Sequence, residues 1–153
     1  MQSRIHELAD DDAPRVLRFD CGGGCGGCHL DTASWLLALS DAGRVGLLRG
    51  SAPEQADVLV VTGAVLRHDA FRLRRLYQRM ARAPVVVAVG ACSLSGGVFA
   101  GAYAVAGGAS EVIPVDVFVP GCPPRADAVL DGMFQSLRSL AATRIEPSLK
   151  IPA

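Results

Sequence analysis

The stretch DVLVVT, residues 57–62, is the segment that says most about the fold. Its apolar residues follow one another without alternation, which is typical of a strand buried on both faces of a parallel sheet. The segment PVVVAV, residues 84–89, has the same character, and VDVFV, residues 115–119, is a third predicted strand. Working outward, RVLRFD, residues 15–20, alternates polar and apolar residues as a strand does, and a short strand is predicted over 44–48.

Segments with apolar residues at helical spacing lie between these strands. Helices are predicted over 32–39, with Asp31 or Thr32 as the cap, over 67–82 and over 125–142. Strands that alternate with helices predict an α/β protein with a parallel sheet that is covered on both sides. The chain shows no internal repeat and no low-complexity linker, which favours a single structural unit.

The composition is that of one folded domain. The chain has 153 residues, of which 50% are hydrophobic and 20% charged, and this balance excludes an intrinsically disordered protein. Basic and acidic residues both number 15, so the net charge is zero. Because a protein that binds nucleic acid through its phosphates is normally basic, we expect no nucleic-acid partner. The high apolar content indicates contact with other subunits.

The two ends of the chain differ from its middle. The first 14 residues, MQSRIHELADDDAP, are polar and acidic and lack the apolar segment of a secretion signal. No apolar run approaches the length of about 18 residues that crossing a bilayer requires. We therefore expect a flexible segment over 1–14, one domain over 15–143, a tail over 144–153 and a cytoplasmic location.

Each of the five cysteines lies just after a predicted strand. Three occur in DCGGGCGGCHLD, and the others occur in VGACSLSGG and in PGCPP. Because the carboxyl ends of parallel strands meet at one edge of a sheet, we expect these loops to lie close together there. The cysteines are Cys21, Cys25, Cys28, Cys92 and Cys122.

Several kinds of site contain converging thiols, and the residues alone are compatible with more than one of them. Disulfides are uncommon in the cytoplasm, and zinc sites of four cysteines usually carry two C-x-x-C pairs, whereas this chain has one. An iron–sulfur cluster takes thiolates from separated loops, and four of them suit a [4Fe–4S] cluster. Glycines such as Gly26, Gly90 and Gly121 let the backbone approach a bulky group. A phosphate-binding loop, a redox dithiol and a buried apolar role for Cys92 are the alternatives.

Four segments resemble blocks of a known family. CGGCHLD resembles the C-x-G-C-x-x-E motif in the small subunits of nickel–iron hydrogenases, above all the membrane-bound, energy-converting group. The others are similar to that group and to the related 20-kDa, NuoB-like subunit of respiratory complex I. They are ADVLVVTGAV, VVVAVGACSLSGGVF and IPVDVFVPGCPPRADAVLDGMFQSL. The resemblance covers roughly residues 19–140, which is most of the chain.

This resemblance implies a flavodoxin-like, doubly wound fold with a mainly parallel sheet and helices on both faces. It also implies one [4Fe–4S] cluster that relays electrons to or from a catalytic large subunit of the hydrogenase type. The implied partners are that large subunit, a ferredoxin-like iron–sulfur subunit and membrane subunits, which would hold the chain peripherally on the cytoplasmic side. The implied cluster ligands are Cys25, Cys28, Cys92 and Cys122.

Other residues near the cysteines take expected roles from the same resemblance. Asp31 stands where the family usually has a glutamate near the proton path, and the alternative is a plain helix cap. Arg125 follows GCPP directly and is predicted to raise the cluster's potential, or else to face solvent or a partner. His29 is expected at a surface or an interface. Cys21 is an extra thiol, either a bystander or a substitute ligand during assembly.

Three functions are weighed on these residues. Complex I subunits of this kind carry two adjacent cysteines, whereas Cys25 and Cys28 are separated by two glycines, which favours the hydrogenase branch. A NuoB-like subunit of a complex-I-related quinone oxidoreductase is the alternative. A phosphate- or nucleotide-binding module is disfavoured because the only lysine is Lys150. The arginine-rich segment 67–82 is either a solvated face or a docking site for an acidic subunit or anionic lipid.

Overall fold

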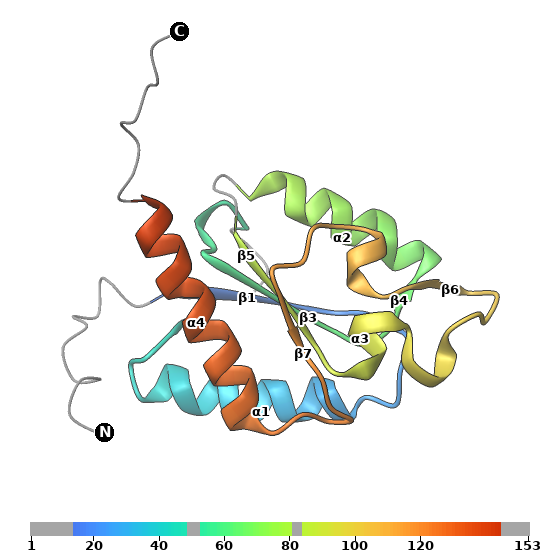
Figure 1. Ribbon diagram of the computed structural model, residues 1–153, viewed down its shortest axis with the longest axis horizontal. Helices are drawn as coiled ribbons and strands as arrows, with labels where there is room; N and C mark the ends of the chain where they lie inside the picture. Colours follow the sequence, from blue (N-terminus) through green and yellow to red (C-terminus); the bar gives the residue numbers. More distant parts are fainter. Residues whose placement is uncertain (1–13, 49–52, 81–83, 145–153) are drawn as a thin grey trace, which may run out of the picture.

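The computed structural model describes residues 14–48, 53–80 and 84–144, and their fold is organised around a five-stranded sheet (Figure 1). Every neighbouring pair of strands in this sheet is parallel, and the order is β2-β1-β3-β5-β7. Counted within the sheet alone, this is the 2-1-3-4-5 order of flavodoxin-like folds, as predicted. The strands are β1 (Arg15–Asp20), β2 (Gly46–Leu48), β3 (Val58–Thr62), β5 (Val85–Val89) and β7 (Val117–Val119).

The continuous apolar segments form the middle of the sheet because both of their faces are covered. All five residues of β3 and all five of β5 are buried, and the two strands pair in register from Val58↔Val85 to Thr62↔Val89. The strands predicted over 57–62 and 84–89 are therefore confirmed to within one residue. The outer strands β2 and β7 are shorter than predicted, with three residues each.

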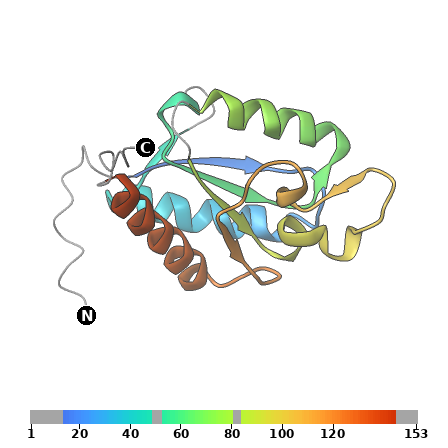
Figure 2. The ribbon, with the colours of Figure 1, turned by 45° about the horizontal axis from the view of Figure 1, so that its top comes forward.

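Helices cover both faces of the sheet, as the resemblance implied. Helix α1 (Gly27–Asp41) and helix α4 (Ala126–Arg144) lie on one face, and α2 (Arg67–Arg79) lies on the other (Figures 1 and 2). Figure 2 shows the green α2 above the sheet and the blue α1 and dark red α4 below it. Two separate apolar clusters result, one around Leu36 and Met133 and the other around Leu73.

Two features of the fold were not predicted. Helix α1 begins at Gly27, five residues before the predicted start, so Asp31 and Thr32 lie inside the helix and the cap prediction is wrong. A small antiparallel ribbon also pairs β4 (Val65–Leu66) with β6 (Val105–Gly107), and the short helix α3 (Ala91–Ser95) lies between these two strands in the chain. Strands of two or three residues are too short to show a period in the sequence.

The ends of the chain leave part of the domain prediction untested. Residues 1–13 and 145–153 lie outside the described ranges, so the flexible segment and most of the tail remain predictions. Helix α4 itself continues to Arg144, one residue past the predicted domain boundary. Within the described ranges, we find no helix with the length and apolar character needed to cross a membrane.

The strand order creates a switch point at the carboxyl edge of the sheet. Strand β1 lies between β2 and β3, so the chain winds outward in opposite directions on its two sides. In sheets of this kind the loops at such a point diverge and leave a crevice that binds ligands. The loops that follow β1, β3, β5 and β7 all reach this edge, and three of them contain cysteine.

Candidate metal centre

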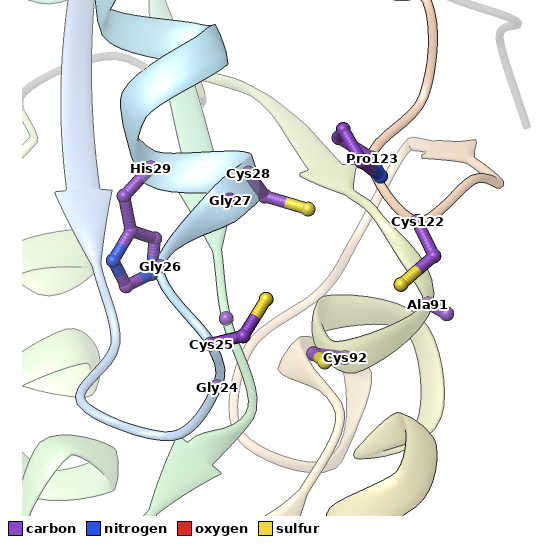
Figure 3. Close-up of a pocket in the computed structure, with 11 residues that line it drawn as sticks. Gly24, Cys25, Gly26, Gly27, Cys28, His29, Ala91, Cys92, Cys122 and Pro123 are labelled. Atoms are coloured by element: carbon purple, nitrogen blue, oxygen red, sulfur yellow. The ribbon is translucent and has the colours of Figure 1, made fainter.

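A pocket at this edge gathers four of the five thiols, as the strand-end pattern predicted. Figure 3 shows the four sulfur atoms arranged around one space, with glycine backbone between them. The pocket draws on the loops after four different strands. Its lining residues are Gly24, Cys25, Gly26, Gly27, Cys28, His29, Gly63, Ala91, Cys92, Cys122 and Pro123.

The four pocket cysteines lie in the first turns of helices or in the loops that lead from strands to helices. Cys25 lies in the loop between β1 and α1, and Cys28 is the second residue of α1. Cys92 is the second residue of α3, and Cys122 lies between β7 and α4. Their sequence separation therefore has no bearing on their distance in space. Cys25 and Cys122 are exposed, whereas the other two are half-buried.

Two glycines allow the cysteine loops to approach one another. Gly90 has φ 87° and ψ 156°, a conformation open essentially to glycine, and a Cβ there would lie 2.5 Å from the Cys28 sulfur. The Gly121 carbonyl accepts a hydrogen bond of 2.8 Å from the Ala91 N–H, which ties the Cys122 loop to α3. Neither Gly90 nor Gly121 is among the lining residues, so both shape the pocket from behind.

Gly26 has a different role from the other glycines. It lines the pocket in the left-handed conformation, φ 85°, and directly precedes α1. This conformation lets the chain pass from the Cys25 loop into the helix without an intervening turn, because glycine adopts positive φ without steric penalty. The second cysteine of the C-x-x-C pair is thereby placed in the first turn of α1.

The pocket thiols lie close enough to affect one another's ionisation. Burial raises the pKa of the Cys28 thiol, and negative charge on Cys92, Cys122, Cys25 and Asp31 raises it further. Burial also raises the pKa of Cys92, with additional contributions from Cys122 and Cys25. Four thiolates in this space repel one another, so their joint ionisation requires positive charge among them.

The pocket thiols form a set of soft donors. Four cysteine sulfurs select iron–sulfur clusters, zinc or copper. In the described part of the chain, no three His, Cys, Asp or Glu side chains are grouped closely enough to hold a single metal ion. The four thiols nevertheless surround one space, and four thiolates from separated loops fit a [4Fe–4S] cluster.

Cys21 lies apart from the pocket. Its side chain is 0% exposed and packs in the apolar cluster with Leu17 and Leu59. Burial, followed by the charges of Asp69 and Asp20, raises the pKa of this thiol to about 12. A thiol that remains protonated is neither a nucleophile nor a metal ligand, so the structure accounts for Cys21 as a core residue.

Cys21 is therefore expected to resist alkylation in the folded protein. At pH 9 a pKa of about 12 leaves about one thiol in a thousand ionised, so iodoacetamide should modify metal-free Cys25 and Cys122 first. Peptide mass spectrometry after timed quenching measures this order, and the urea-unfolded chain serves as the control. Equal modification rates for Cys21 and Cys25 in the folded chain would contradict the buried, protonated state.

Arg125 and Asp31 lie beside the pocket rather than in it. Both border an adjoining open cleft, together with Trp35. The Arg125 side chain is 87% exposed, and its Nε lies 3.3 Å from Asp127 Oδ1. Asp31 is also exposed, although its charge contributes to the raised pKa of Cys28.

His29 lies closer to the pocket than a plain surface residue. It is half-buried and lines the pocket, with Nε2 only 2.8 Å from the position that a Cβ on Gly63 would take. Figure 3 shows its ring on the opposite side of the first turn of α1 from the Cys28 sulfur. Its backbone carbonyl accepts a hydrogen bond of 3.3 Å from Arg18.

The polar contacts that hold the first cysteine loop were not predicted. The Thr62 hydroxyl donates to Asp20 Oδ1 at 2.7 Å, which joins the ends of β3 and β1. The buried Asp69 carboxylate accepts a hydrogen bond of 2.7 Å from the Gly22 N–H. These contacts span 42 and 47 residues, so no local pattern in the sequence reports them.

Comparison with known proteins identifies similar chains among oxidoreductase subunits. The family described as "NADH ubiquinone oxidoreductase, 20 Kd subunit" matches residues 25–136, a range that contains all four pocket thiols and excludes Cys21. The probable membrane-bound hydrogenase subunit mbhJ of Pyrococcus furiosus is 39% identical over 143 residues, which is 92% of this chain and 85% of that protein.

Two further relatives represent longer proteins. Formate hydrogenlyase subunit 7 of Escherichia coli is 41% identical over 80% of this chain. NAD(P)H-quinone oxidoreductase subunit K of a Synechococcus strain is 40% identical over 75% of this chain. The chain spans 48% of the length of each, so it corresponds to about half of these two proteins.

Solved structures share the fold. A chain of the membrane-bound sulfane sulfur reductase, an archaeal respiratory membrane complex, matches with a TM-score of 0.65 and 25% identity, over 84% of this chain and 70% of that one. A chain of an NAD⁺-reducing [NiFe]-hydrogenase matches with a TM-score of 0.56 over 92% of this chain and 97% of that one. At 23% identity, the second match carries information about the fold alone.

Proposed function

Because the chain belongs to the family of the NADH ubiquinone oxidoreductase 20 Kd subunit, we propose that it holds one [4Fe–4S] cluster and relays electrons within an oxidoreductase complex. Its relatives are named as subunits of hydrogenases and quinone oxidoreductases, in agreement with the predicted family and enzyme class. Membership of the family does not by itself establish the cluster, its ligands or its electron path, which we propose here.

One observation carries the proposal. Four thiols from loops after three separate strands line one pocket at the switch point of a parallel sheet. Sulfur-only donors from separated loops suit a [4Fe–4S] cluster, and the proposed ligands are Cys25, Cys28, Cys92 and Cys122. A phosphate site is not supported, because no arginine or lysine is among the described residues that line the pocket.

The residues of this chain supply the setting for electron transfer. When bound, a cluster of this kind supplies one-electron redox chemistry. The cysteines fix its place, and the glycine backbone lets the protein approach it closely while its peptide groups and the surrounding apolar core tune its potential. The exposure of Cys25 and Cys122 leaves one side open, so a partner protein can approach this side and exchange electrons.

We propose a hydrogenase-type large subunit as the partner on this open side. The spacing of Cys25 and Cys28, and the relatives named as hydrogenase and formate hydrogenlyase subunits, favour it. The exposed Leu30, at 72%, supplies apolar surface next to the pocket residue His29. A quinone oxidoreductase of the complex I type is the alternative, which the NAD(P)H-quinone oxidoreductase relative favours.

Further partners follow from the same proposal. A subunit with one cluster requires a donor or acceptor, for which we propose a ferredoxin-like iron–sulfur subunit. Membrane subunits would hold the chain peripherally on the cytoplasmic side. The outer face of α2 offers a docking surface, because Arg74 and the aromatic-stacked Arg75 are exposed there. Asp31 is proposed as an acid near the proton path, and Arg125, which borders the same cleft, is proposed as a nearby positive charge that raises the potential of the cluster.

Metal analysis of the complex tests this function. The chain, produced anaerobically with its companion subunits, should contain about four iron and about four acid-labile sulfide per copy. Adding hydrogen to the complex should reduce the cluster, which electron paramagnetic resonance detects at low temperature. If hydrogen does not reduce the cluster but a quinol does, the chain belongs to a quinone oxidoreductase rather than to a hydrogenase. Protein without iron or sulfide would contradict the cluster itself.

A further inference from the structure

We propose that Asp69 is a positioning residue for the loop that carries Cys25, through the hydrogen bond that its carboxylate accepts from the Gly22 N–H. This inference deepens the proposed function and rests on it. Asp69 does not line the pocket and belongs to α2, on the opposite face of the sheet from α1. Its influence on a cluster would therefore pass through the loop alone.

The loop between β1 and Cys25 has few means of holding its shape. Its residues 22–24 are all glycines, so they have no side chains with which to pack. Backbone contacts must fix them instead. The Cys21 N–H donates to the Thr62 carbonyl at 2.9 Å, and Gly23 pairs in both directions with Ala64. The Gly22 N–H donates to Asp69 Oδ2 at 2.7 Å.

The Asp69 contact differs from the others because a side chain makes it. A substitution can remove a carboxylate, whereas the carbonyls of Thr62 and Ala64 are present in every variant. Asp69 is only 3% exposed, and its other oxygen, Oδ1, lies 3.3 Å from His68 Nε2 and 3.9 Å from Arg72. The charge of a carboxylate in the first turn of a helix is also stabilised by the helix dipole.

Gly22 is shaped to receive this carboxylate. A Cβ on Gly22 would lie 3.0 Å from Leu66 Cδ1 and 3.3 Å from Asp69 Oδ2, so any side chain there would crowd both groups. The same hydrogen bond can therefore be disturbed from either end. Because Gly22 is exposed, water can replace the carboxylate as acceptor in a variant, but water cannot anchor the loop to α2.

The test compares Asp69→Ala, Gly22→Ala and Asp69→Asn with the wild type in the iron-loaded complex. Asparagine keeps an oxygen acceptor at this position, so it should preserve the contact. Glu54→Ala is the matched control, since the Glu54 carboxylate also contacts α2, by accepting a hydrogen bond of 2.9 Å from Arg79, but is exposed and does not line the pocket. Two readouts are used: the rate of iron release to a chelator, and the paramagnetic resonance spectrum of the reduced cluster.

We expect Asp69→Ala and Gly22→Ala to release iron about tenfold faster than the wild type, the change expected for one hydrogen bond to a charged group. Their spectra should change, because Cys25 is displaced, whereas Asp69→Asn and Glu54→Ala should match the wild type. Should Asp69→Ala fail to fold, Gly22→Ala carries the test. Release rates and spectra equal to those of Glu54→Ala would overturn the role of Asp69, and a wild type without iron would instead overturn the proposed function.

Discussion

Replacing Cys92 by serine is expected to leave the purified protein colourless and nearly free of iron. Cys92 projects from the first turn of α3 into the pocket. The other described thiols in the pocket lining are Cys25, Cys28 and Cys122, so no further thiol there can replace it. A serine hydroxyl keeps the size of the side chain but is rarely ionised and binds iron weakly. The cluster would then lack one of its four thiolate ligands and also the negative charge by which that thiolate balances the iron.

Cys21→Ser is the matched control for this variant. Cys21 lies only four residues before Cys25 in the sequence. Its side chain is nevertheless 0% exposed, in the apolar cluster on the sheet face that α2 covers. A serine there leaves a buried hydroxyl, which costs about 1–3 kcal/mol of folding stability but no ligand. Iron and sulfide analysis, with visible absorbance, should therefore show near-wild-type content. Equal iron loss in the two variants would show that the ligand set is wrong.

The parallel topology explains why the site was visible in the sequence at all. Continuous apolar runs such as 57–62 and 84–89 can form little except central strands, and parallel strands bring every following loop to one edge. Cysteines at strand ends could therefore be brought together without any knowledge of distances. The convergence of four thiols at one pocket follows from connectivity, and connectivity follows from the alternation of strand and helix.

What the sequence could not reveal depends on backbone conformation and on long-range contacts. The early start of α1 is set by the left-handed conformation of Gly26, and a run of glycines carries no periodic signal that marks a helix start. His29 was expected at a surface or an interface, and its closeness to Gly63, which follows β3 and lies 34 positions later in the chain, is a long-range feature that no local pattern reports. Arg125 is exposed in the cleft beside the pocket, so its predicted effect on the potential of a cluster stays a prediction.

Gly90→Ala is expected to remove most of the cluster although it changes no ligand. The new Cβ would lie 2.5 Å from the Cys28 sulfur, 3.5 Å from the Gly121 carbonyl and 3.7 Å from the Cys28 Cβ. Cys28 is held by α1, so its sulfur can yield only by rotating away from the pocket. The φ of 87° and ψ of 156° add about 1–3 kcal/mol of backbone strain for a residue with a Cβ.

Gly26→Ala separates the crowding of the Cys28 sulfur from the backbone strain. Gly26 has nearly the same φ, 85°, but no atom lies within 4 Å of the Cβ that alanine would add. This variant should lose about 1–2 kcal/mol of stability through its left-handed conformation and still hold iron. Urea unfolding of the metal-free chains gives the stability, and iron per chain after anaerobic loading gives the occupancy. If crowding of the Cys28 sulfur is the cause, Gly90→Ala loses iron out of proportion to its stability. If both glycine variants lose iron in proportion to stability, strain alone is responsible, and the placement of Cys28 against Gly90 has no special part in forming the site.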